Sequence, residues 1–278
     1  AARAGARVLL AERGQLPRHK VCGEFVSPEA LEHLAGLLDK TAIRGDAPRI
    51  SCARIFLDGE MREAPVDPPA LSLPRYELDY ALWCAAETAG TSVRQQFTVN
   101  AIQGAGPFTL ISGEGEVRAG AVIDASGRWS NLTPEARASG SGEQGGRWLG
   151  LKAHYAEDQP AASVDLYFFE GGYCGVQPIA AGGINVCALV RAEAARNLQQ
   201  VFARNRSLWR RSRAWEALTE TVSTSPVFFR EPKPLRAGVV CAGDAAGFLD
   251  PFAGDGISLA LHSGALAAGS LARYLEGR

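Results

Sequence analysis

The most informative motif of the sequence lies near the C-terminus. It reads Gly238-Val239-Val240-Cys241-Ala242-Gly243-Asp244-Ala245-Ala246-Gly247, followed two residues later by Asp250-Pro251-Phe252-Ala253-Gly254-Asp255-Gly256-Ile257. Its apolar start predicts a buried strand that delivers one carboxylate, Asp244, at its end. A Gly/Pro turn then leads into a helix, whose N-terminus favours negative charge, and Gly254 and Gly256 let backbone N–H groups approach a ligand closely. Such a site suits a cofactor with polyol hydroxyls and a ring that becomes anionic on reduction, which describes a flavin; the alternative is a plain strand-to-helix turn.

The N-terminal residues carry a second, weaker signal of the same kind. Residues 7–12 predict a strand that ends in the carboxylate of Glu12, and residues 1–5 resemble the tail of a helix. In dinucleotide-binding folds an acidic residue that binds the ribose follows the first Gly of G-x-G-x-x-G by about 20 residues. Counted back from Glu12, that turn falls before Ala1. We therefore expect an N-terminally truncated dinucleotide-binding protein without its first strand and Gly-rich loop; the alternative is a fold that begins with this strand.

Local patterns between these two signals predict alternating helices and strands. Ser27 and Pro28 are the preferred residues for the start of a helix, Asp58-Gly59 is typical of a hairpin, and Gly90 ends a run with helical spacing. Helices are predicted over 28–38 and 75–89, and strands over 50–57, 61–66, 92–102, 108–112 and 116–123. Residues 133–146, rich in Ser, Gly and Glu, are predicted to form a linker.

The chain beyond the linker has antiparallel hairpin spacing. Strands are predicted over 148–155, 163–169, 173–179, 184–190 and 227–229, and helices over 192–203, 207–220 and 256–275. The fold class expected is α/β, a Rossmann-like FAD-binding domain interleaved with an antiparallel β-sheet substrate domain. The FAD-binding domain comprises residues 1–48, 73–135 and 233–278, the substrate-domain hairpin residues 49–72, and the antiparallel substrate domain residues 136–232.

Composition excludes several classes of protein. The 278 residues carry 29 Lys plus Arg against 30 Asp plus Glu, so the basic footprint of a nucleic-acid binder is missing. The cluster Arg210, Arg211 and Arg213 is expected to be a solvated helix face. The six cysteines have no metal-ligand spacing and are expected to be reduced thiols, and no stretch has the roughly 20 apolar residues that cross a bilayer. We expect a cytoplasmic protein without a metal; peripheral membrane contact and the oligomeric state stay open.

Four segments, in order, resemble the superfamily of FAD-dependent aromatic-ring monooxygenases (p-hydroxybenzoate hydroxylase-like) and geranylgeranyl reductases, which also includes flavin halogenases. The segment quoted first is similar to the family's second flavin-binding motif, which implies that Asp244 bonds the ribityl chain and that residues 251–257 lie against the flavin ring and pyrophosphate. Glu12 resembles the acid that binds the adenosine ribose. Residues 122–130 (VIDASGRWS) resemble the strand and turn that recross the cofactor site, and residues 73–79 (LPRYELD) resemble the R-x-x-L-D helix start.

Two further segments resemble the geranylgeranyl-reductase branch. Residues 19–24 (HKVCGE) are similar to its K-x-C-G-E segment next to the cofactor, and residues 171–178 (GGYCGVQP) to its G-G-Y-x-W-x-F-P strand over the flavin. Gly175 stands where a Trp is common, which leaves room over the ring and disfavours a halogenase. The cofactor-binding residues so implied are Glu12, Arg13, Cys22, Gly23, Arg75, Asp124, Ser126, Gly127, Gly243, Asp244, Pro251, Gly254, Asp255, Gly256 and Ile257.

No firm catalytic residue is predicted, because the flavin carries the chemistry of such enzymes. Lys152 and His154 alternate on one face of a predicted strand and point either at a substrate cavity or outward as a polar face. Tyr173 is a third candidate, with ordinary strand packing as its alternative. Cys22 is either reactive towards the flavin or a small buried thiol.

The resemblance implies an FAD-dependent oxidoreductase that reduces a C=C bond of an isoprenoid or polyketide-like lipid. NAD(P)H is the expected transient electron donor, with reduced ferredoxin as the alternative. Two other functions stay open: an FAD- and NAD(P)H-dependent aromatic monooxygenase, and a truncated, non-catalytic relic that cannot hold FAD. A strict requirement for O₂ would separate the monooxygenase from the reductase.

Overall fold

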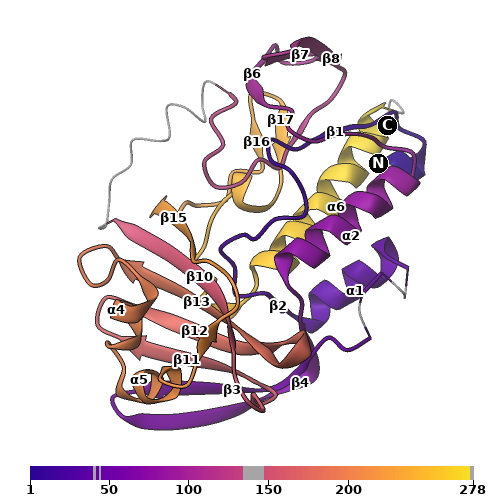
Figure 1. Ribbon diagram of the computed structural model, residues 1–278. Coiled ribbons are helices and arrows are strands. Elements are labelled where there is room, and N and C mark those ends of the chain that lie inside the picture. Colours follow the sequence, from indigo (N-terminus) through magenta and orange to yellow (C-terminus); the bar gives the residue numbers. More distant parts are fainter. Residues whose placement is uncertain (40–41, 44, 134–146, 276–278) are drawn as a thin grey trace.

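The computed structural model describes residues 1–39, 42–43, 45–133 and 147–275. One end of the molecule is a large, mainly antiparallel sheet, and the other end groups three helices with short parallel strands (Figure 1). The chain crosses between these two ends several times, as expected for interleaved parts. The α/β fold class predicted from the sequence is confirmed.

The large sheet has nine strands. Eight follow the order β14-β10-β13-β12-β11-β3-β4-β2, and β15 pairs with β10 on the same edge as β14. The hairpin predicted at Asp58-Gly59 joins β3 to β4, and the strands predicted over 148–155, 163–169, 173–179 and 184–190 are all present. The strands are β2 (Phe25–Val26), β3 (Arg49–Leu57), β4 (Glu60–Ser72), β10 (Trp148–Ala156), β11 (Ser163–Phe169), β12 (Gly172–Ile179), β13 (Gly183–Arg191), β14 (Glu216–Ala217) and β15 (Val222–Val227).

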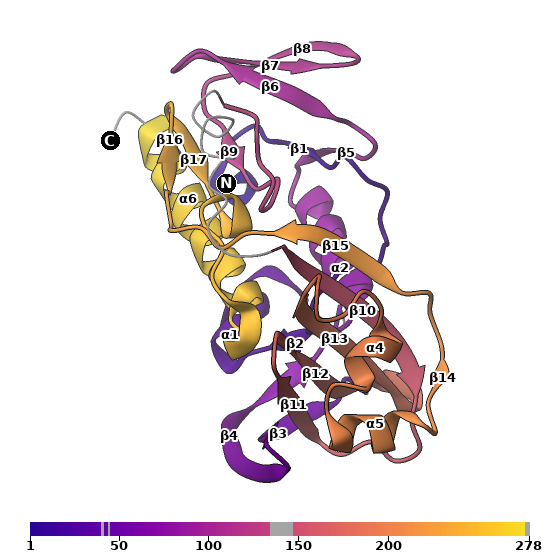
Figure 2. The same ribbon diagram turned by 90° about the vertical axis from the view of Figure 1, so that its left-hand side faces the viewer.

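The two faces of this sheet have different chemistry. Leu151, Ala153 and Tyr155 of β10 join a buried apolar cluster that α4 (Leu198–Phe202) and α5 (Arg206–Ser212) cover. Figure 2 shows both helices on one side of the sheet. Because side chains alternate along a strand, Lys152 and His154 point to the opposite face, towards the three-helix end of the molecule. Buried Asn185 and Gln177 lie on this second face too, which we call the polar face, although Trp148 and Leu189 pack with Phe248 at one end of it.

The three-helix end contains two separate parallel strand pairs. β1 (Leu9–Ala11) pairs with β5 (Ser92–Arg94), and β9 (Ile123–Asp124) pairs with β17 (Val239–Cys241), which also pairs with β16 (Leu235–Arg236). A three-stranded antiparallel sheet, β6 (Val99–Gln103), β7 (Phe108–Ser112) and β8 (Gly115–Ala119), lies beyond them. The helices are α1 (Pro28–Leu37), α2 (Arg75–Thr88) and α6 (Gly256–Leu275), with short 3₁₀ helices η1 (Ala2–Ala4), η3 (Ala180–Gly182), η4 (Gly243–Ala245) and η5 (Pro251–Ala253).

Helix α1 begins where the sequence predicts it. The Ser27 hydroxyl accepts a hydrogen bond from the N–H of Ala30, and Pro28 occupies the first turn, where its missing N–H costs nothing. Helix α6 occupies 256–275, as predicted, and α1 packs against it. Helix α6 in turn packs against η4, in the loop that follows β17.

Several predicted elements are wrong in extent. The helices expected over 192–203 and 207–220 are shorter, because Asn197 and Asn205 each cap a new helix start and residues 216–217 join the sheet instead. The strand expected over 227–229 starts at Val222 and ends at Val227, and residues 1–5 contain only the 3₁₀ helix η1. The predicted linker lies outside the described residues except for Thr133. In the described part of the chain no helix is long and apolar enough to span a membrane.

The prediction of a solvated arginine face is wrong for Arg211. Its guanidinium donates to Glu157 through Nε and Nη2, at 2.6 Å each, and to Asp165 through Nη1 at 2.6 Å. Arg54 of β3 donates to the same Asp165 through Nε and Nη2, at 2.6 and 2.5 Å. This set of Arg54, Glu157, Asp165 and Arg211, the Arg211 cluster, fastens α5 to the sheet.

Candidate functional site

The carboxyl ends of β9 and β17 lie side by side, because the two strands are parallel neighbours. The loops that follow them carry Arg128 and Asp244, whose side chains lie 3.8 Å apart at Nε and Oδ2. Burial raises the pKa of the Asp244 carboxyl above its ordinary value, although the guanidiniums of Arg128, Arg75 and Arg230 act in the opposite sense. Asp244 is therefore a partly desolvated carboxyl within reach of several cations, at the edge of the sheet where α/β folds bind ligands.

Asp124 and Ser126 shape the turn after β9. The Asp124 carboxylate accepts hydrogen bonds from the Ser126 N–H at 2.9 Å, the Ser126 hydroxyl at 2.6 Å and the Ser130 hydroxyl. Gly127 follows at φ +91, and an added Cβ there would meet no heavy atom within 4 Å. The turn is held rigid by Asp124, while the backbone at Gly127 stays open to a ligand.

The loop that leads into α6 depends on one glycine. Gly254 has φ +80, and a Cβ added there would lie 2.8 Å from the Phe25 ring. The loop can therefore pack on the segment after Gly23 only with a glycine at this position. Pro251, Asp255 and Gly256 are exposed and Ile257 is buried, so the N-terminus of α6 is accessible; the N–H of Gly243 is fixed to α6 by the Ser263 hydroxyl at 2.9 Å.

Glu12 lies directly after β1, at the carboxyl end of that strand. Its Oε1 accepts a hydrogen bond from the Gly14 N–H at 2.6 Å and from Arg18 Nη2 at 3.0 Å, so its contacts lie in its own loop. Arg13 beside it is exposed. Glu12 is thus placed at a strand end where its carboxylate can accept hydrogen bonds from the hydroxyls of a sugar.

The segment of Cys22, Gly23 and Glu24 is fixed from two sides. Asn185 of β13 donates from Nδ2 to the carbonyls of Cys22 and Gly23, at 3.1 and 2.8 Å. Glu24 Oε1 accepts from the N–H of Arg75, at 2.9 Å, and so caps α2, whose own N-cap Pro74 has no capping side chain. Arg75 in turn holds Asp79 through Nε and Nη2, at 2.8 and 3.0 Å. Several candidate residues thus meet where α2 begins.

Lys152 and His154 both bind Glu24. Lys152 Nζ lies 2.8 Å from Glu24 Oε1, and His154 Nε2 lies 2.8 Å from Oε2. The side chains of Lys152, Glu24 and His154 are 0%, 0% and 3% exposed. The expectation of an outward polar face is therefore wrong: the two side chains point into the protein. We call Glu24, Lys152 and His154 the Glu24 cluster.

Electrostatics within the Glu24 cluster favour the ionised carboxylate. Burial acts to raise the pKa of Glu24, but the hydrogen bond from His154 and the positive charge of Lys152 outweigh it, so the pKa lies below its ordinary value. A buried charge needs such partners, because desolvation otherwise costs several kcal/mol per ion, on the order of what a small protein has in total stability. The cluster thus keeps a carboxylate and an ammonium together inside the protein.

Tyr173, on β12, lies on the same polar face, two strands from β10. Its hydroxyl donates to Asp250 Oδ1 at 3.2 Å, and burial, with Asp250 nearby, raises its pKa. Beside it, a Cβ added at Gly175 would make ordinary contacts with Leu166 and the carbonyl of Cys187, at 3.6 and 3.7 Å. Tyr173 therefore connects the sheet to the loop that precedes α6.

Sequence reasoning missed four residues of this site. Glu24 and His19 belong to the segment that was identified as cofactor-adjacent, but neither was singled out; Arg128 belongs to the turn after β9. No local signal marks Asn185, whose role depends on the pairing of β10 with β13 that brings it opposite His154.

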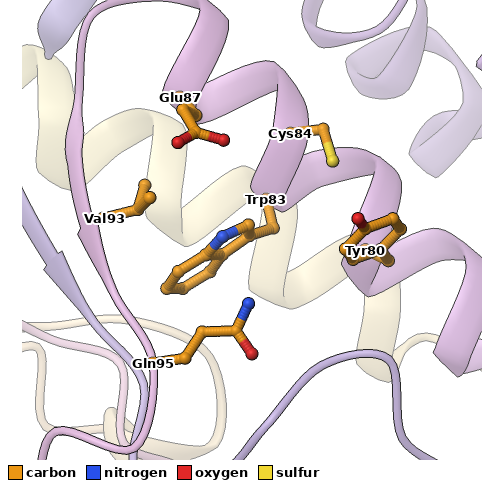
Figure 3. A pocket seen from close by; sticks show the side chains of 6 residues that line it. All are labelled: Tyr80, Trp83, Cys84, Glu87, Val93 and Gln95. Carbon is orange, nitrogen blue, oxygen red and sulfur yellow. The ribbon is translucent and has the colours of Figure 1, made fainter.

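A hollow of about 320 Å³ lies elsewhere, between α2 and β5 (Figure 3). Its lining comprises Tyr80, Trp83, Cys84, Glu87, Val93 and Gln95. None of the predicted cofactor residues is among them, so this hollow is separate from the candidate site.

The donor set fits a flavin dinucleotide. Glu12 and Asp244 are carboxylates at strand ends that suit sugar and polyol hydroxyls, and Arg128 and the N-terminus of α6 suit a pyrophosphate. Added Cβ atoms at Gly23, Gly127 and Gly256 would meet no heavy atom within 4 Å, so the backbone at these points is open to close approach.

Known proteins resemble the chain in sequence and in fold. No protein-family model matches the chain. A digeranylgeranylglycerophospholipid reductase of Methanopyrus kandleri is 29% identical over 304 residues, which cover 99% of this chain and 73% of the relative.

Solved structures share the fold. A flavoprotein/dehydrogenase from Cytophaga hutchinsonii superposes with a TM-score of 0.82 and 21% identity, covering 99% of this chain and 74% of its own. The myxobacterial chondrochloren halogenase, an FAD-dependent enzyme, has a TM-score of 0.81 and 24% sequence identity, over 100% of this chain and 71% of its own. A flavin-dependent brominase has a TM-score of 0.83 and 21% sequence identity, over 100% of this chain and 75% of its own.

Proposed function

The chain is related by sequence and by fold to the FAD-dependent oxidoreductases of the geranylgeranyl reductase and aromatic-ring monooxygenase superfamily, and on that premise we propose that it reduces a C=C bond in an isoprenoid or polyketide-like lipid. In this proposal residues 1–48, 73–135 and 233–278 bind FAD, and residues 49–72 and 136–232 bind the substrate. NAD(P)H is the proposed electron donor.

One observation carries the choice of a reductase. The K-x-C-G-E segment at residues 20–24 is held between the start of α2 and the polar face of the large sheet, through Asn185, Arg75, Lys152 and His154. This chain therefore uses the segment that resembles geranylgeranyl reductases as a junction between the cofactor-binding part and the sheet. The likeness to a named reductase over 99% of the chain supports the same choice.

The residues of this chain would bind and orient the reactants. Glu12 and Asp244 would hold the sugar hydroxyls, Arg128 and α6 the pyrophosphate, and the open backbone at Gly23 and Gly127 would let the cofactor approach. FAD, once bound and reduced, supplies the hydride. The polar face of the sheet would hold the proton that completes the reduction.

The experiment begins with the absorbance spectrum of the purified chain after incubation with FAD. Flavin bands that survive gel filtration support the cofactor assignment. Reduction of isoprenoid lipids is then assayed with NAD(P)H, with and without O₂. Product that forms without O₂ supports the reductase; product that strictly requires O₂ identifies an aromatic monooxygenase instead. If the protein does not bind added FAD, both enzymatic functions are contradicted, and a non-catalytic protein that cannot hold FAD is supported instead.

Gly254→Ala tests the cofactor loop. The added methyl would lie 2.8 Å from Phe25 at a φ of +80, so the loop must shift and we expect FAD to be lost on gel filtration. Gly264→Ala is the matched control: it lies inside α6 with nothing within 4 Å, and should keep FAD while adding up to about 1 kcal/mol of stability. Equal flavin content in both variants would contradict the placement of FAD at this loop.

A further inference from the structure

The Glu24 cluster contacts a residue nearer the surface, His19. Lys152 Nζ lies 3.3 Å from His19 Nδ1, and His19 is partly exposed, whereas Lys152 is fully buried. The His19 ring also lies 4.7 Å from the ring of Tyr76 and 5.2 Å from that of His154. These contacts hold the imidazole in place over the buried ammonium.

The geometry decides which nitrogen of His19 carries the proton. An ammonium can only donate, so Nδ1 must accept from Lys152, and the proton of the neutral imidazole is then on Nε2. His154 differs, because its Nε2 faces a carboxylate and must itself donate. His19 is thus the member of this group that can present an N–H to a reactant.

The other charged and titratable groups around His19 largely neutralise one another. Asp79 of α2 binds Lys20 at 2.7 Å and Arg75 at 2.8 Å. Burial lowers the pKa of His19, and the charges of Lys152 and His154 lower it further. The negative charge of Glu24 acts in the opposite direction but does not outweigh them. The remaining groups on adjoining elements are Cys22, Tyr76 and, on β13, Cys187, whose thiol burial keeps protonated. His19 is therefore held as the neutral imidazole near pH 7.

We propose that His19 is a catalytic proton donor, and that the Glu24 cluster fixes its tautomer and resupplies its proton. The proposal rests on the reductase function proposed above. After hydride addition to one carbon of the double bond, the Nε2–H bond of His19 breaks and its proton goes to the other carbon. A proton of Lys152 Nζ passes to Nδ1, leaving a neutral amine beside Glu24. Solvent returns one proton through the same imidazole. The two candidates on β10, Lys152 and His154, are then positioning residues, since they are buried.

The tautomer is tested without cofactor or substrate. The chain has four histidines, so ¹H–¹⁵N spectra of the imidazoles can be assigned with single substitutions. In the wild-type protein at pH 7.5 we expect His19 as the Nε2–H tautomer. Lys152→Met should mix the two tautomers and bring the His19 pKa back towards its ordinary value of about 6.5. The wild-type spectrum decides the tautomer even where that variant does not fold. An Nδ1–H tautomer, or a tautomer unchanged in Lys152→Met, overturns the proposal.

The catalytic role is tested by His19→Gln, which can neither take up nor release a proton. We expect kcat to fall about 10²–10⁴-fold with KM and flavin content unchanged. His33→Gln, on α1, is the matched control and should keep wild-type kcat. His19→Gln with wild-type kcat overturns the proposal. A wild-type protein with the expected tautomer but no reductase activity contradicts the proposed function and supports the coupling of His19 to Lys152.

Discussion

Two buried charge clusters lie on opposite faces of one sheet, and they are built differently. The Arg211 cluster shares its face with Ala153 and Val176, under α5; the Glu24 cluster lies on the polar face. The first pairs two arginines with two carboxylates, and its arginine side chains are 25% and 20% exposed. The second sets one carboxylate against a fully buried lysine and a histidine. Arginine keeps its charge at any ordinary pH, whereas lysine and histidine can give up a proton.

This contrast separates a structural cluster from one suited to chemistry. The pairs Arg54–Asp165 and Arg211–Glu157 are bidentate, which adds geometric precision, and Arg211 fastens α5 to the sheet. The Glu24 cluster contains no bidentate pair, but it brings groups with exchangeable protons together where residues 20–24 meet the sheet. If this distinction holds, the two clusters respond differently when one of their charges is removed.

The largest effect is expected from Glu24→Gln. This change leaves the buried Lys152 ammonium without its carboxylate and should lower the free energy of unfolding by about 3–5 kcal/mol. The matched change on the other face, Asp165→Asn, should cost about 1–3 kcal/mol, because Arg54 and Arg211 reach solvent and Arg211 keeps Glu157. Urea unfolding at pH 7.5 measures both. An equal or larger loss in Asp165→Asn would contradict the distinction.

A second substitution, at Lys152, should restore most of the stability that Glu24→Gln loses. When Lys152→Met is combined with Glu24→Gln, no unpaired charge stays buried, so the double variant should regain most of what Glu24→Gln loses and come within about 2 kcal/mol of wild type. The two single variants and the double variant form a cycle in urea unfolding. If the losses of unfolding free energy in the two single variants simply add up in the double variant, the Lys152–Glu24 contact contributes no coupling energy.

The sequence predicts the elements of this site better than its contacts. Ser27 and Pro28 mark α1, Asp58-Gly59 marks the β3–β4 hairpin, and the Gly-rich run after Asp250 marks the start of α6, because each of these signals is local. The alternation of Lys152 and His154 shows that they share a face, but period-two spacing does not say which side the core occupies. That depends on Glu24, which lies 128 residues from Lys152.

The wrong predictions for Arg211 and for the helix at 207–220 also come from long-range contacts that no local pattern shows. Arg210, Arg211 and Arg213 are equivalent in composition, and only the packing of α5 selects Arg211 to meet Asp165 and Glu157. The helix at 207–220 is predicted too long because residues 216–217 pair with β10, a long-range contact that outweighs local propensity.

A small effect is expected on the pH dependence of the free energy of unfolding. The pKa of His19 lies below its ordinary value in the folded protein, so acidification from pH 7.5 to 5.5 protonates His19 in the unfolded chain before the folded one and lowers stability. In the Arg211 cluster the arginines stay charged, and the hydrogen bonds from Arg211 and Trp215 outweigh burial and hold the pKa of Glu157 below its ordinary value, further from this window. His19→Gln should therefore lose less stability than wild type between the two pH values, whereas Asp165→Asn should keep the wild-type pH dependence. Urea midpoints at pH 7.5 and 5.5 measure this difference. The same pH dependence in wild type and His19→Gln would show that His19 titrates alike in both states, and with it the electrostatic contrast between the two faces would be lost.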